Sequence, residues 1–161
     1  MTAVRQRLWD ANVVLDYLSG NQNVQPDCDL ILNQAQQGQI EIVVSTIAEA
    51  EVAYLPGLSP ADSEAKIREF FSRDYIVIAT FDSPIARIAR IARRLIRDYK
   101  GLRSADAVHW ATAVRFHIPI LETTDPDLLK HTGKEGNPSV IIQKPTYQGT
   151  IPMFPTSPPV N

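Results

Sequence analysis

Residues 8–20 read LWDANVVLDYLSG, in which a short apolar run is followed by an aspartate and then by apolar residues at helical spacing. The run that ends at Trp9 predicts a buried strand, and Asn12 is of the residue type that caps the start of a helix. Gly20 marks the end of that helix, because glycine adopts the left-handed conformation common at helix C-termini. A strand followed at once by an amphipathic helix is the repeating unit of a parallel sheet with covering helices.

The same alternation continues through the rest of the chain. It predicts further strands at 40–44, 75–79, 119–121 and 140–142, and further helices at 27–37, 45–55, 59–73, 83–99, 104–116 and 126–131. We therefore expect an α/β fold, a three-layer sandwich around a central parallel sheet of about five strands. From residue 145 onward, five prolines lie among Thr, Ser and Gly. We divide the chain into a domain at 1–144 and an extended or disordered Pro-rich tail at 145–161.

The composition indicates one globular domain. With 161 residues, of which 44% are hydrophobic and 21% charged, the chain can bury a sizeable core. Cys28 is the one cysteine, so the fold does not depend on an oxidising compartment. No apolar run approaches the roughly 20 residues that cross a bilayer, and the N-terminus lacks the apolar region of a signal peptide. We expect a cytoplasmic protein that does not associate with membranes.

Four acidic residues fall where this fold would bring them together. Asp10 ends the first strand and Asp125 follows the fourth, while Glu51 and Asp106 lie in the first two turns of helices that begin near the same edge. The carboxyl ends of parallel strands meet at one edge, which is where such folds place their functional groups. Carboxylates held close together repel one another unless a cation lies between them, and oxygen ligands favour Mg²⁺ or Mn²⁺. Such an ion activates water and neutralises charge on a phosphodiester.

Each of these acids also has a purely structural interpretation. Asp10 could end a strand and cap the following helix. Asp106 could be a first-turn carboxylate favoured by the helix dipole. Asp125, followed by proline, could be a helix cap, and Asp127 fits the same first turn. The convergence of four acids from distant segments is what favours a metal site.

The segment at 46–51 contains two glutamates, and the helix geometry separates them. Thr46 and Glu49 match the capping-box pattern, in which the glutamate bonds back to the start of the helix. Glu51 lies two residues further, about 200° around the helix, so the two side chains cannot share a face. We therefore assign the structural role to Glu49 and the metal role to Glu51.

Four stretches in order resemble the motifs of the PIN-domain family, in particular the toxin nucleases of bacterial and archaeal toxin–antitoxin pairs (VapC-like). They are LWDAN at 8–12, VSTIAEAEV at 44–52, SADAVHWATA at 104–113 and ETTD at 122–125. No single stretch is specific, but four in this order are. The position where many relatives carry threonine is Ala48 here, and the Pro-rich tail is not part of the common pattern.

The resemblance implies a Mg²⁺- or Mn²⁺-dependent ribonuclease. It implies that the catalytic and metal-binding residues are Asp10, Glu51, Asp106 and Asp125. Thr123 would be the hydroxyl that supports the last acid, and Asn12 would be a supporting group near the first. The resemblance also implies an RNA substrate, a homodimer, and inhibition by an antitoxin protein that inserts a segment near the active site.

A basic face is predicted on the helix at 83–99. Its five arginines, at 87, 90, 93, 94 and 97, lie opposite the apolar side, and Lys100 and Arg103 extend the basic stretch. The net charge of −2 argues against nonspecific coating of nucleic acid but permits a local basic patch. The face is either simply solvated or an RNA-phosphate patch with Arg90, Arg94 and Arg103 as its contacts.

The remaining polar and aromatic residues do not indicate a different chemistry. We interpret His109, on the apolar helix that follows Asp106, as packed in the core rather than as a general base. Trp9 and Trp110 are interpreted as core residues. Ser45 and Ser104 lack a credible His–Asp pairing, which disfavours a serine hydrolase.

The leading hypothesis is therefore an endoribonuclease that acts as the toxin of a toxin–antitoxin pair. Three alternatives remain open. The chain could be a PIN-type RNA-processing nuclease without an antitoxin, or a non-catalytic RNA-binding or interaction module. It could also be a phosphatase-like α/β domain, although the lysine expected after a late strand in such domains is missing.

Overall fold

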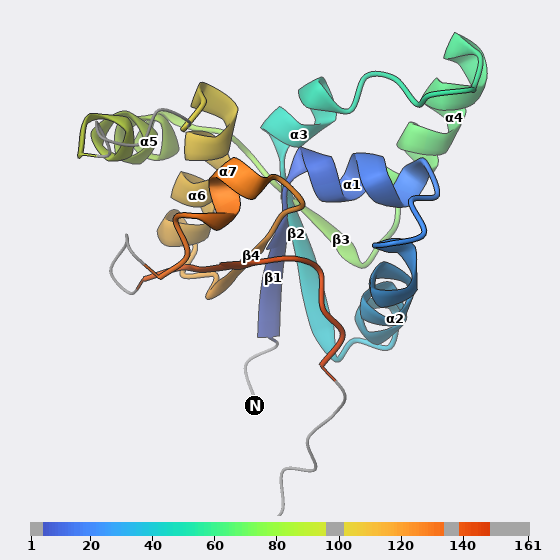
Figure 1. Cartoon of the computed structure of the whole chain (residues 1–161), viewed down its shortest axis with the longest axis horizontal. Coiled ribbons are helices and arrows are strands. Elements are labelled where there is room, and N and C mark those ends of the chain that lie inside the picture. Colours follow the sequence, from blue (N-terminus) through green and yellow to red (C-terminus); the bar gives the residue numbers. More distant parts are fainter. Residues whose placement is uncertain (1–4, 96–101, 134–138, 149–161) are drawn as a thin grey trace, which may run out of the picture.

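The computed structural model describes residues 5–95, 102–133 and 139–148. Within these residues, five strands form one parallel sheet in the order β3-β2-β1-β4-β5 (Figure 1). The strands are β1 (Arg5–Trp9), β2 (Ile40–Ser45), β3 (Ile76–Ala79), β4 (Ile120–Glu122) and β5 (Ile141–Gln143). The predicted α/β fold with a central parallel sheet is confirmed.

Helices cover both faces of the sheet, as Figure 1 shows. One side carries α1 (Ala11–Leu18), α2 (Gln25–Gln36) and α4 (Pro60–Phe71), and the other carries α5 (Ser83–Leu95) and α6 (Ser104–Arg115). The short helices α3 (Thr46–Glu51) and α7 (Pro126–Leu129) follow β2 and β4 at the carboxyl edge of the sheet. The predicted continuation of α5 to residue 99, with Arg97 and Lys100, lies outside the described residues.

The strands are almost continuously apolar because both faces of the sheet are buried. Trp9 and Val44 pack towards α1, α2 and α4, whereas Leu8 and Val43 pack towards α5 and α6. Trp9 is fully buried and its ring lies nearly parallel to that of Phe70, with the ring centroids 6.4 Å apart. Trp9 and Trp110 are core residues, as predicted.

Two predicted helix caps are wrong. Asp10, not Asn12, caps α1: its backbone is extended, and its carboxylate accepts a hydrogen bond from the Val13 N–H at 3.0 Å. Ser104, the residue expected to cap the helix at 104–116, is instead the first residue of α6, and the extended residue before it is Arg103. In both cases the extended conformation required of a cap falls one or two residues from the predicted position.

Helix α3 is shorter than predicted, because it ends at Glu51 rather than near residue 55. Beyond it, Val52 and Leu55 are buried from a loop and not from a helix, whereas Ala53 and Tyr54 are exposed. Leu55 is fully buried, and its N–H donates to the Ser63 Oγ on α4 at 3.3 Å. The apolar pattern over 52–55 reflects this loop packing.

The first residues of the Pro-rich segment contact the domain. The Thr146 carbonyl accepts a hydrogen bond from the Arg7 Nη1 at 3.0 Å, and the Tyr147 N–H donates to the Asp27 Oδ1 at 2.8 Å. Residues 149–161 lie outside the described residues. In the described part of the chain, no helix is long and apolar enough to cross a membrane.

Candidate active site

The register of the sheet aligns the ends of its central strands. Trp9 of β1 pairs with Val44 of β2 on one side and with Glu122 of β4 on the other. The residues that follow each strand therefore lie at the same edge, which places Asp10 beside Thr123. The loop after β4 leads directly from Thr123 to Asp125.

Asp10 is a buried carboxylate that the protein leaves incompletely satisfied. Its side chain is almost wholly buried, and its Oδ2 forms no hydrogen bond with any described residue. Burial raises the pKa of Asp10 from its ordinary 3.8 to about 6, although the nearby His109 ring and Thr123 hydroxyl lower it in part. The Asp106 charge adds to the rise. A cation at this edge would offset both the desolvation cost of the Asp10 charge and its repulsion by Asp106.

Asp106 and Asp125 form the next part of the cluster. Burial raises the pKa of Asp106, and the charge of Asp125 raises it further. The Asp106 Oδ2 accepts a hydrogen bond from the Arg103 N–H at 3.3 Å. Asp125 caps α7, and its own N–H donates to the Thr123 Oγ1 at 3.0 Å. Thr123 thus lies between the first and last acids.

Glu51 reaches this cluster through His109. The Glu51 Oε2 lies 2.8 Å from the His109 Nε2. His109 is buried on α6 one turn beyond Asp106, and its ring is close enough to Asp10 and Asp106 to lower the pKa of both. The burial agrees with the packed histidine predicted from the sequence, but its bond to Glu51 was missed. The sequence did offer one signal: His109 lies three residues after Asp106 on a predicted helix, so the two side chains share a face.

Glu49 does not join the acidic cluster, but it does not form the predicted capping box either. The predicted capping box is wrong: Ser45 caps α3 by accepting from the Ile47 N–H at 3.4 Å. The Thr46 Oγ1 instead accepts from the Phe81 N–H at 3.0 Å. Glu49 is exposed and lines a separate hollow between α3 and α4.

The donor chemistry fits a hard divalent ion, but the carboxylates are not preassembled around one position. No three Asp, Glu, His or Cys side chains among the described residues form a ready metal-binding group. Two of the four acids are paired with basic side chains: Glu51 with His109, and Asp125 with the Arg103 Nη2 at 3.5 Å. The unbonded, buried Asp10 oxygen and the mutual repulsion of Asp106 and Asp125 are the features that a hard cation would satisfy.

Of the four acids, Asp125 lines a cleft of about 630 Å³. We call it the acid cleft; residues lining it include Asn12, Asp16, Tyr54, Arg103, Thr124 and Asp125. The Asn12 amide forms no hydrogen bond with Asp10 or with any other described residue, so the supporting contact expected of it is not formed here.

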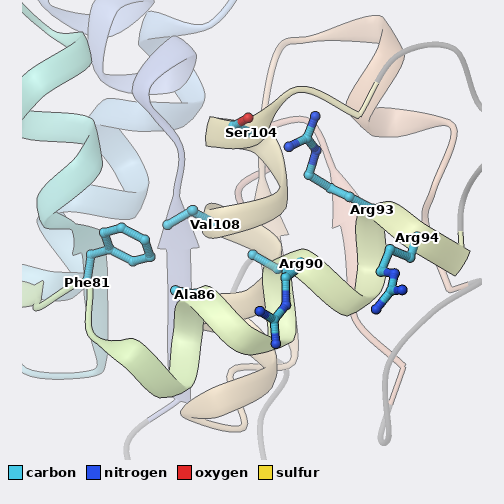
Figure 2. Close-up of a pocket in the computed structure, with 8 residues that line it drawn as sticks. Phe81, Ala86, Arg90, Arg93, Arg94, Ser104 and Val108 are labelled. Carbon is cyan, nitrogen blue, oxygen red and sulfur yellow. The ribbon is translucent and has the colours of Figure 1, made fainter.

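The three arginines predicted to bind RNA are divided between two places. Arg90 and Arg94 line a hollow of about 420 Å³ between α5 and α6, together with Arg93 and Phe81 (Figure 2). In the view of Figure 2, Arg93 extends towards Ser104 at the start of α6, whereas Arg90 and Arg94 extend away from it. Arg103, whose side chain is 71% exposed, belongs to the acid cleft.

Comparison with known proteins identifies the family. The sequence model of the PIN domain matches residues 8–135, which is most of the chain. This chain belongs to the PIN-domain family. PIN domains are a nuclease family, and the matched residues include every acid described above. No curated protein matches the sequence.

Solved PIN-like structures share the fold. The VapBC2 complex of Rickettsia felis, bound to a DNA fragment from its promoter, matches with a TM-score of 0.66 at 15% identity, covering 86% of this chain and 98% of that chain. A toxin–antitoxin complex from Klebsiella pneumoniae matches with a TM-score of 0.54 at 25% identity, covering 76% and 89%. FitAcB from Neisseria gonorrhoeae matches with a TM-score of 0.56 at 20% identity, covering 86% and 97%.

Proposed function

We propose that this PIN domain is a metal-dependent endoribonuclease that hydrolyses RNA phosphodiester bonds, and that it is the toxin of a toxin–antitoxin pair. The observation that carries the proposal is the buried Asp10 with one unbonded oxygen, next to Asp106 at the carboxyl edge of the sheet. A buried carboxylate oxygen without a hydrogen-bond donor is costly unless a ligand completes its environment.

The residues that would hold Mg²⁺ or Mn²⁺ are Asp10, Glu51, Asp106 and Asp125. When bound, such an ion supplies water of lowered pKa and compensates charge on the phosphodiester. Thr123 orients the loop that carries Asp125 by accepting its N–H. His109 restrains the Glu51 carboxylate, and Arg103 offsets the charge of Asp125 at the mouth of the cleft.

The partners and setting follow from the same proposal. An antitoxin partner is supported by the solved neighbours, which include a toxin–antitoxin complex from Klebsiella pneumoniae. We further propose a homodimer, a cytoplasmic location and RNA contacts through Arg90, Arg94 and Arg103. The division into a nuclease domain at 1–144 and a tail at 145–161 is likewise a proposal.

Cleavage of RNA by the purified chain tests the proposal. Single-stranded and structured RNAs are incubated with Mg²⁺, with Mn²⁺ or with EDTA, alongside Asp10→Asn and Asp106→Asn. We expect cleavage that requires the ion and is lost in both variants, whereas Glu49→Gln, a matched change on the other side of α3, cleaves normally. Cleavage that survives both aspartate substitutions would show that the site is elsewhere.

The toxin role has its own test. Expression of the chain in a bacterial host should arrest growth, and co-expression of the protein encoded next to it should relieve the arrest. A nuclease that cleaves RNA in vitro but never arrests growth would be a PIN-type processing enzyme without an antitoxin. A folded chain that binds RNA but cleaves none would be a non-catalytic module.

A further inference from the structure

The acid cleft has a wall that is held in place before any ligand arrives. Asp16 on α1 accepts hydrogen bonds from the Thr124 Oγ1 at 2.6 Å and from the Asn21 Nδ2 at 2.9 Å. The Thr124 bond joins α1 to the loop between β4 and α7, which carries Asp125, and the Asn21 bond ties the same carboxylate to the segment after α1. At about 630 Å³, the cleft is within the size range of pockets that take small organic groups.

Tyr54 presents an aromatic ring to this cleft from a fixed backbone. It lies in the segment between α3 and α4, and 58% of its surface is exposed. Its neighbours Val52 and Leu55 are buried, and the Leu55 N–H is bonded to Ser63. In the described part of the chain, the Tyr54 ring stacks on no other aromatic ring. An exposed ring on a rigid support is a suitable platform for a planar ligand.

Asn12 supplies hydrogen-bonding capacity in the same cleft. It lies on α1 two residues after Asp10, and its amide is not used by the described residues. A side-chain amide carries both donors and an acceptor, so it can bond the edge of a base.

The charges in the cleft favour a base over a phosphate in its interior. Asp16 and Asp125 repel a phosphate, whereas a neutral base is not repelled. Among the described residues that line the cleft, Arg103 is the cation, and its mostly exposed side chain lies 3.5 Å from the Asp125 Oδ2. The sugar–phosphate backbone is therefore expected on the Arg103 side, where this cation offsets the charge of Asp125.

We propose that the acid cleft binds one unpaired nucleotide of single-stranded RNA, next to the phosphate that is cut. The base stacks on Tyr54, and Asn12 contacts its edge. This inference rests on the proposed nuclease function, because it assumes that RNA passes the acids. It assigns sequence-independent affinity to Tyr54 and base preference to Asn12, since stacking tolerates every base whereas edge contacts do not.

Binding measured without cleavage tests the inference. Binding of the full chain to labelled single-stranded oligonucleotides is followed by fluorescence anisotropy in EDTA. The oligonucleotides are U-rich, A-rich, C-rich or G-containing. Tyr54→Ala should weaken binding of every single strand by roughly fivefold or more, since stacking contributes substantially for each base. Tyr54→Phe should bind as the unchanged protein does, and binding of a duplex should not depend on Tyr54. Asn12→Ala should change the order of preference among the bases.

Phe116→Ala is the matched control, because Phe116 is a comparably exposed aromatic residue at the opposite end of α6 from Asp106. The inference fails if Tyr54→Ala binds single strands normally or if Phe116→Ala weakens binding as much. It also fails if Tyr54→Ala and Asn12→Ala weaken binding of an antitoxin but not of RNA. Tyr54-dependent binding without any cleavage would count against the nuclease and leave the cleft assignment standing. Cleavage with an unchanged KM in Tyr54→Ala would count against the cleft assignment and leave the nuclease function standing.

Discussion

Replacing Asp10 with asparagine should stabilise the metal-free protein, although it removes a proposed catalytic group. A difference of one in pKa corresponds to about 1.4 kcal/mol. Raising the pKa of Asp10 from 3.8 to about 6 therefore means that keeping it ionised at neutral pH costs the folded state about 3 kcal/mol. The buried asparagine amide retains part of the polar desolvation cost, so we expect a gain of about 2 kcal/mol.

The sign of the pH dependence follows from the raised pKa. The stability that protonated Asp10 contributes is fully present below pH 3.8 and is lost as the pH rises through about 6. The advantage of Asp10→Asn over the unchanged protein should therefore be largest above pH 7 and shrink as the pH falls towards 5. Glu122, whose pKa is also raised by burial, affects both proteins alike and cancels in the difference. Asp106 does not cancel, because its charge and that of Asp10 repel each other and Asp10→Asn removes this repulsion, which adds to the expected gain at high pH.

Urea denaturation in EDTA, followed by tryptophan fluorescence at several pH values, measures this difference. Asp16→Asn is the matched control on the same helix: it disturbs two satisfied hydrogen bonds and should not stabilise the protein. Adding Mg²⁺ at a hundred times its Kd should raise the unfolding free energy of the unchanged protein by about 2.7 kcal/mol and that of Asp10→Asn by much less. A loss of stability in Asp10→Asn, or a gain that does not depend on pH, would refute the reasoning.

Three further predictions concern other buried or charged groups. The Glu122 carboxylate is buried, pairs with the Arg7 Nη1 at 2.8 Å and accepts a hydrogen bond from the Trp9 Nε1 at 2.7 Å. Arg7→Met should destabilise the protein by about 3–5 kcal/mol in denaturation experiments, because Glu122 then stays buried without its cation; a change below 1 kcal/mol would mean that the Trp9 bond is enough to hold the buried charge. His109→Leu should lower kcat for RNA cleavage by roughly tenfold through misplacement of Glu51, with His109→Gln less affected; equal kcat for both would exclude a positioning role. Arg90→Ala should weaken RNA binding at low salt and reduce its salt dependence, and an unchanged salt slope would assign the α5 face to solvent.

The fold was predictable because the apolar periodicity is strong and its connections are short. Strands at 40–44 and 75–79 were recognisable from β-branched residues, and the start of the helix at 59–73 from the serine followed by proline at 59–60. The caps of α1 and α6 were misplaced, because several adjacent polar residues can cap a helix and only the backbone conformation decides between them. The loop after α3 was wrongly predicted as helix. Its buried residues, Val52 and Leu55, have the three-residue spacing of a helix face although the backbone there is not helical.

Part of the candidate site was predictable because it depends only on where the strands end. Asp10 and Asp125 follow strands whose ends meet in any parallel sheet, so their convergence needs no knowledge of packing. The contact between Glu51 and His109 joins residues 58 apart and depends on the rotation of two helices. Likewise, a helical wheel cannot show that Arg90 and Arg103 line different hollows, because this is set by where α5 packs on α6.

Binding of Mn²⁺ by the folded chain tests the central claim most directly, because it needs neither the RNA target nor the partner. Electron paramagnetic resonance or calorimetric titration at pH 7.5 compares the unchanged protein with Asp106→Asn, Glu51→Gln and Glu49→Gln. We predict saturable binding that Asp106→Asn and Glu51→Gln weaken at least tenfold and that Glu49→Gln leaves unchanged. Binding that all three variants retain would contradict the account.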